Sequence, residues 1–113
     1  MARTEITVQQ SSLAGITPTF NAAIADGHMF KNDGNVIIEV KNAAGADVTV
    51  TIQTPAKVQG IDLAEITVTV PATTGHKLIG PFDPSLFNQS NGMVYVDYSS
   101  ATAVTIMAVD TKL

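Results

Sequence analysis

Alternation of β-branched and polar residues is the feature that most constrains the fold of this chain. Between residues 48 and 52, valine and isoleucine alternate with threonine. The same two-residue period occurs in four other runs, at residues 36–41, 66–70, 94–97 and 103–109. Successive side chains of a strand point to opposite faces of a sheet, so the pattern predicts strands with one buried face and one solvated face.

Turn-forming dipeptides separate these runs. They are Asp26-Gly27, Asp33-Gly34, Ala44-Gly45, Gln59-Gly60, Thr74-Gly75 and Asn91-Gly92. The prolines stand at or beyond the ends of the runs, where the missing backbone N–H does least harm to a ladder. With shorter candidates at 4–9, 28–31 and 76–79, the chain is predicted to be all-β. We expect an antiparallel β-sandwich or small barrel of about eight short strands.

At most two short helical turns are expected beside the strands. Residues 20–25 form one candidate, closed by Asp26-Gly27 with the glycine as C-terminal cap. Residues 83–87 form the other, because Asp83 is a good N-cap and Pro84 suits the first helical position. The segment 9–18 has no clear pattern and is expected to be irregular.

Size and charge restrict the class of protein. The chain of 113 residues fits one domain, residues 1–113, and has no cysteine for disulfides or thiolate metal sites. Its net charge of −4 and scattered basic residues argue against nucleic-acid binding. Charged residues make up 14% of the chain, against about 25% in ordinary domains. Such a surface suits a subunit packed against neighbours, and it equally suits a very stable monomer. No apolar run approaches the length of a membrane span, and no secretory signal is visible.

Catalytic and metal-binding patterns are not found in the sequence. His28 and His76 have no paired spacing and no nucleophile motif beside them, so we expect a partly exposed structural histidine and an exposed turn histidine. Asp62 and Glu65 are expected to solvate a loop, since no tryptophan is present to line a sugar cleft. The sequence therefore predicts no enzyme, no cofactor and no metal.

Two aromatic residues are candidates for an interface. Phe82 and Phe87 bracket the loop between Pro81 and Pro84. Each is more readily explained as a lid on the domain's own core. An exposed aromatic side chain in a proline-fixed loop would nevertheless make a good contact with a partner.

Several stretches of the chain together resemble a known group of proteins. They are residues 26–34, 40–42, 48–55, 66–71, 79–82 and 87–97, in that order and spacing. In these stretches the chain resembles small structural proteins encoded in the head gene clusters of tailed bacteriophages and prophages. The resemblance implies a virion protein made in the host bacterial cytoplasm. The role it most favours is a decoration, or cement, subunit on the capsid exterior, which bridges major capsid protein subunits and is often trimeric.

The resemblance also implies a role for the N-terminus. Decoration proteins commonly use an N-terminal arm to add a strand to the capsid lattice, and here Arg3, Thr4, Glu5 and Ile6 are the candidates within residues 1–10. The alternative is that this segment is the first strand of the domain's own sheet. The resemblance leaves two other roles open, a head–tail completion or tail subunit and a glycan-binding adhesion module of the virion.

Overall fold

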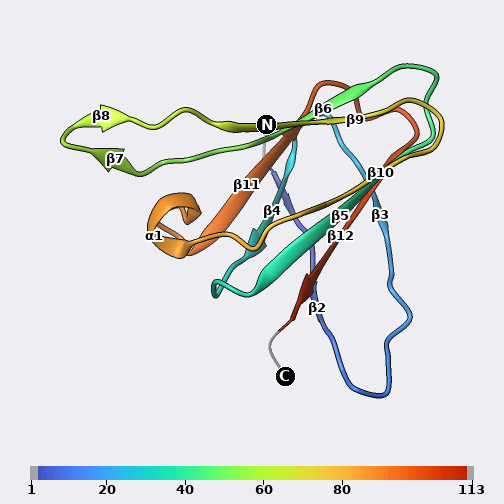
Figure 1. Ribbon diagram of the computed structural model, residues 1–113, viewed down its shortest axis with the longest axis horizontal. Coiled ribbons are helices and arrows are strands. Elements are labelled where there is room, and N and C mark those ends of the chain that lie inside the picture. Colours follow the sequence, from blue (N-terminus) through green and yellow to red (C-terminus); the bar gives the residue numbers. More distant parts are fainter. Residues whose placement is uncertain (1–2, 112–113) are drawn as a thin grey trace.

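The computed structural model describes residues 3–111 and confirms an all-β fold of the sandwich type, with two sheets facing each other (Figure 1). The first sheet runs in the order β1 (Thr4–Glu5), β4 (His28–Lys31), β11 (Met93–Tyr98), β6 (Val48–Ile52) and β9 (Ile66–Val70). The second runs β10 (Gly75–Ile79), β5 (Val36–Asn42), β12 (Val104–Asp110) and β2 (Val8–Gln10), with β3 (Asn21–Ala22) also paired to β12.

The core lies between the sheets and is built by the alternating residues. In β6, Val48, Val50 and Ile52 are buried while the threonines between them are not. The same phase holds in β5 and at the start of β12. The fully buried side chains come from both sheets: Phe30, Val36, Ile38, Val40, Val48, Val50, Ile52, Val70, Val94, Val96, Val104 and Ile106. Burial of these apolar surfaces is the main force that holds the sheets together.

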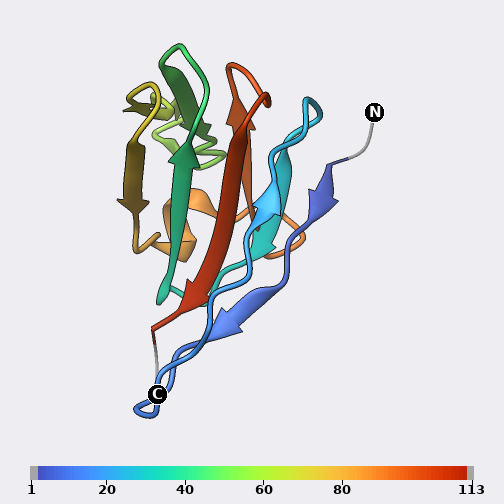
Figure 2. The ribbon, with the colours of Figure 1, turned by 90° about the vertical axis from the view of Figure 1, so that its right-hand side faces the viewer.

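The N-terminal segment departs from the predicted antiparallel arrangement. Strand β1 pairs parallel with β4, and β2 pairs parallel with β12. The segment thus crosses from one sheet to the other and closes that side of the sandwich (Figure 2). Parallel pairing is possible here because the connection from β2 to its partner β12 spans most of the chain, whereas a short hairpin would enforce an antiparallel pair.

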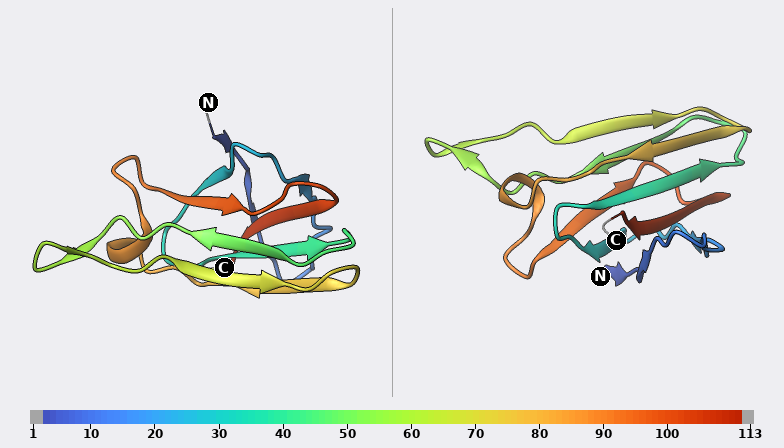
Figure 3. Two further views of the ribbon diagram at one scale, coloured as in Figure 1. Left: turned by 90° about the horizontal axis from the view of Figure 1, so that it is seen from above. Right: turned by 60° about the horizontal axis from the view of Figure 1, so that its bottom comes forward.

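The described residues form more strands than the eight expected. The strand predicted at residues 4–9 is divided into β1 and β2, and the strands with no counterpart in the prediction are β3, β7 (Lys57–Val58) and β8 (Ile61–Asp62), of two residues each. Two residues are too few to show a period, so alternation does not reveal them. Strands β7 and β8 form a hairpin that continues the β6–β9 ribbon beyond the sandwich (Figure 3).

One of the two predicted helical turns is confirmed. Helix α1 (Pro84–Phe87) has Asp83 as its N-cap, and the Asp83 side chain accepts a hydrogen bond from the Ser85 N–H. The turn predicted at residues 20–25 is wrong, because Asn21 and Ala22 form β3. There the Ala23 N–H donates to the Val104 carbonyl at 2.8 Å. The sheet edge supplies hydrogen bonds that an isolated helical turn cannot match.

Candidate protein-interaction surfaces

Arg3 fastens the N-terminal segment to its own domain. Its guanidinium donates to both carboxylate oxygens of Asp97, at 2.6 and 3.1 Å, and to the Val96 carbonyl at 3.2 Å. It also lies 4.6 Å from the centre of the Tyr95 ring, as in a cation–π contact. Arg3 is therefore engaged within the chain.

Asp97 is the centre of this small network. Burial works against its charged form, but hydrogen bonds from Arg3 and Gln53 outweigh that effect and lower the pKa of the carboxyl. The carboxylate therefore remains charged around neutral pH and keeps Arg3 in place.

The other N-terminal candidates divide into exposed and buried residues. Thr4 and Glu5 are exposed and pair with His28 and Met29 of β4. Ile6 is only 3% exposed and belongs to the core. Of the four N-terminal candidates, Thr4 and Glu5 are the two whose side chains are exposed.

Phe82 and Phe87 pack on the domain's own core. Phe82 is 3% exposed, and its ring centre lies 5.7 Å from that of Phe30 and 5.3 Å from that of Phe87. Phe87 is half-buried beside it. Both aromatic residues are lids of the core, so Phe82 has no surface to present to a partner.

The two histidines lie in separate environments. His28 is 2% exposed, unlike the partly exposed residue expected, because its position in β4 directs it between the sheets. Its Nδ1 lies 2.7 Å from the Tyr98 hydroxyl, and burial lowers the pKa of the imidazole. His76 belongs to β10 and contacts the Glu39 carboxylate at the surface.

The remaining candidate polar residue with a partner is Asp62. Asp62 belongs to β8 and pairs with Lys57 across the β7–β8 hairpin at 2.8 Å, with both side chains largely exposed. Within residues 3–111, no group of three or more histidine, aspartate or glutamate side chains is placed to hold a metal ion. None of the helices described in this range is long and apolar enough to cross a membrane.

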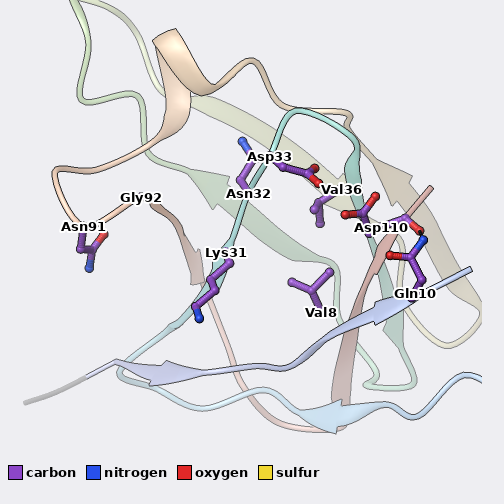
Figure 4. A pocket seen from close by; sticks show the side chains of 9 residues that line it. All are labelled: Val8, Gln10, Lys31, Asn32, Asp33, Val36, Asn91, Gly92 and Asp110. Atoms are coloured by element: carbon purple, nitrogen blue, oxygen red, sulfur yellow. Dashed lines mark hydrogen bonds between the residues drawn. The ribbon is translucent and has the colours of Figure 1, made fainter. Parts of the chain in front are cut away.

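A recess of about 400 Å³ lies at one end of the sandwich, beside the crossing N-terminal segment (Figure 4). Val8 and Val36 line it together with Lys31 and Asn32. The Asn32 amide is held by structural hydrogen bonds, since its Nδ2 donates to the Phe82 carbonyl at 3.0 Å and to Asn88 at 2.8 Å.

Two projecting hairpins are the surfaces that sequence reasoning missed (Figure 1). One is the β7–β8 hairpin, where Ile61 is 71% exposed. The other is the excursion of residues 11–20 between β2 and β3, where Leu13 is 93% exposed. Both side chains are apolar, and both are accessible to another protein because they lie on parts of the chain that project from the sandwich.

The β7–β8 hairpin is shaped by its turn conformation, and the 11–20 excursion is held at its base by side-chain hydrogen bonds. The β7–β8 turn has positive φ at Gln59 and Gly60, 52° and 80°, as a tight two-residue hairpin turn requires. At the base of the excursion, the Gln9 side-chain amide donates to the Thr19 carbonyl at 2.9 Å and accepts from the Thr19 N–H at 3.0 Å. The Gln59-Gly60 dipeptide is one of the turns predicted from the sequence, but nothing in the sequence indicated that this turn projects from the sandwich.

Comparison of the chain with known protein families, curated proteins and solved structures finds no match. The class that its fold and surfaces define is a two-sheet β-sandwich with two projecting hairpins.

Proposed function

We propose that this protein is a capsid decoration subunit of a tailed bacteriophage, which binds the outside of the shell and bridges neighbouring major capsid protein subunits. The observation that carries the proposal is the pair of projecting hairpins with exposed apolar residues, Leu13 and Ile61. The resemblance of the sequence to phage head proteins supports the choice of partner.

A bridging role needs two contact points on one rigid body. The hairpins leave the sandwich at different places, with the β7–β8 hairpin extending sideways and the 11–20 excursion extending from the end near β2 (Figure 1). Two contacts held by one body reinforce each other, because the second forms at a high effective concentration once the first is made. The preformed turns reduce the entropy lost on binding.

Binding to shells tests the proposal directly. Purified protein is mixed with expanded, undecorated shells of the cognate major capsid protein and sedimented. We expect saturable binding at a fixed ratio of the two proteins. Failure of the protein to co-sediment at any concentration would rule out the decoration role.

Matched substitutions locate the contact. Leu13→Asp and Ile61→Asp each place a charge at a projecting tip, and each is expected to weaken shell binding at least about tenfold, since burying an unpaired charge is costly. Leu78→Asp is the control, because Leu78 is 66% exposed but lies on β10 in the body of the sandwich. Equal loss in all three variants would show that the tips have no special role.

A further inference from the structure

Among residues 3–111, two five-residue strands have an unpaired outer edge, β9 and β10, and β9 is the one that carries no charged residue. On the opposite side of the sandwich, β1 covers β4, while β2 and β3 cover β12. The neighbouring edge strand β10 carries His76 and Lys77, and charged residues discourage strand addition. Strand β9 is the uncharged sequence Ile-Thr-Val-Thr-Val, and within residues 3–111 no strand pairs with its outer edge.

The hydrogen-bond phase of the sheet identifies the free backbone groups. The Gln53 N–H donates to the Tyr95 backbone carbonyl at 3.1 Å, and the Ser99 N–H donates to the Thr49 backbone carbonyl at 2.9 Å. In a central antiparallel strand, the backbone N–H and C=O groups of successive residues form hydrogen bonds with the two neighbouring strands in turn. The backbone groups of the odd-numbered residues of β6 therefore point to β11, and those of the even-numbered residues point to β9. Val68 lies opposite Val50 and is therefore bonded to β6. The N–H and C=O groups of Thr67 and Thr69 consequently point outward.

The side chains along this edge are also open to a partner. Thr67 and Thr69 are exposed, and Ile66 is 43% exposed although it shares the inward-facing side of the strand with buried Val70. The sandwich thus leaves part of its own apolar face uncovered beside the free edge. An added strand would bond to the threonine backbones and cover Ile66 and half-buried Val68 at once.

We propose that β9 pairs antiparallel with β9 of a second copy of this chain, about a two-fold axis at Val68. In this register Thr67 lies opposite Thr69 of the copy, Val68 lies opposite its counterpart, and Ile66 lies opposite Val70. Threonine–threonine pairs and pairs of β-branched residues are favourable across strands, and no like charges meet. Centring the axis on Thr69 would place Thr67 opposite Pro71, which has no N–H to donate.

The copy is favoured as the occupant because the same strand supplies both halves of a neutral, self-complementary pair, as a two-fold interface requires. This inference does not depend on the proposed function, and it departs from the trimer that the phage resemblance implies. It is tested without shells, so its failure and the failure of shell binding are separate results.

Charge substitutions at the two exposed threonines test the register. The double variant T67K/T69K places lysine opposite lysine twice, so we expect its dimer dissociation constant to rise at least about tenfold. The variant T67K/T69E places lysine opposite glutamate and is expected to remain dimeric. Mixing T67K/T69K with T67E/T69E is expected to restore a dimer containing one of each.

The measurement is molar mass by light scattering and sedimentation, with circular dichroism to confirm that each variant is folded. A wild-type protein that stays monomeric at its highest soluble concentration would overturn the proposal. So would dimerisation that is the same in all the charge variants, because the contact would then lie elsewhere.

A cysteine placed on the two-fold axis gives an independent test. Val68 faces its counterpart as a non-hydrogen-bonded pair, with an expected Cα separation of about 4.5 Å, which a disulfide can bridge. The chain has no cysteine of its own. Oxidised Val68→Cys is therefore expected to form a covalent dimer, whereas Ile66→Cys, which lies opposite residue 70, is not. Equal cross-linking of both variants would contradict the register.

Discussion

Asn42 is a single residue that joins the two sheets. Its side chain is 2% exposed, and its Nδ2 donates to the Ala46 carbonyl at 2.9 Å and to the Val70 carbonyl at 3.1 Å. Its Oδ1 accepts from the Ala44 N–H at 2.9 Å. Asn42 ends β5 and Val70 ends β9, so one buried amide connects opposite sheets and also holds the turn after β5.

Replacement of Asn42 by alanine is expected to lower the free energy of unfolding by about 2–4 kcal/mol, because it removes three hydrogen bonds that a buried side-chain amide makes to backbone groups. Urea denaturation followed by circular dichroism measures the change. Asn21→Ala is the control, since Asn21 is exposed, and it is expected to cost less than about 0.5 kcal/mol. A loss for Asn42→Ala no larger than for this control would contradict the role of the amide.

His28 is expected to make stability depend on pH. Burial lowers its pKa in the folded state below the unfolded value of 6.5, so the unfolded chain binds a proton that the folded chain resists. Its contribution is complete above pH 6.5 and is lost as the pH falls through and below that value. The slope from one such group is at most about 1.4 kcal/mol per pH unit.

The measurement for His28 is the free energy of unfolding at several pH values between 7.5 and 5, for the wild type and for His28→Gln. We expect the variant to lose less stability on acidification than the wild type does. Parallel curves for the two proteins would show that His28 does not titrate differently in the folded and unfolded states.

At the scale of elements, the N-terminal segment depends on Arg3. The Ile6 N–H donates to the Met29 carbonyl at 2.9 Å, while the Arg3–Asp97 contact fastens the end of the segment. Arg3→Ala is expected to speed hydrogen exchange of the amides in β1 and at Ile6, with little effect on the central strand β12. Because the ion pair is partly exposed, the global loss is expected to be about 1 kcal/mol or less.

Hydrogen exchange detected by mass spectrometry follows this segment separately from the core. Lys31→Ala is the matched control, because Lys31 is an exposed cation at the end of β4. Unchanged exchange of β1 in Arg3→Ala would mean that backbone pairing alone holds the segment.

The long strands were predictable from the sequence, and the short ones were not. The five alternating runs correspond to β5, β6, β9, β11 and β12. In four of them the alternating apolar residues are buried against the other sheet, while in β9 only Val70 is buried. Strands such as β3 exist only because β12 offers a hydrogen-bonding edge, which is a tertiary effect. The helical turn predicted at residues 20–25 was wrong for this reason: the local sequence suits a helical turn, but pairing with β12 makes Asn21 and Ala22 a strand.

The candidate surfaces were harder to predict than the fold. Phe82 and Ile6 are apolar residues of the kind found in protein contacts. Both are buried in the core, because segments distant in the sequence pack over them. Leu13 and Ile61 carry no pattern that separates them from core residues. Their exposure follows from their position on hairpins that leave the sandwich, which only the three-dimensional structure reveals.

At the scale of the whole molecule, the sandwich has one closed side and one open side. The N-terminal segment covers the edges of β4 and β12, whereas within residues 3–111 no strand pairs with the outer edges of β9 and β10. The body therefore presents a free strand edge and two separate projecting tips. This arrangement is consistent with a subunit that binds a copy of itself through the edge and other proteins through the tips.

Imaging of assembled phage particles by electron cryomicroscopy tests the decoration role most directly. We expect density for this chain at positions repeated over the outside of the shell, with Leu13 and Ile61 against neighbouring major capsid protein subunits. Density confined to a single vertex or to the tail would contradict that role and favour a head–tail or tail subunit. Particles that lack the chain altogether would rule out a virion role.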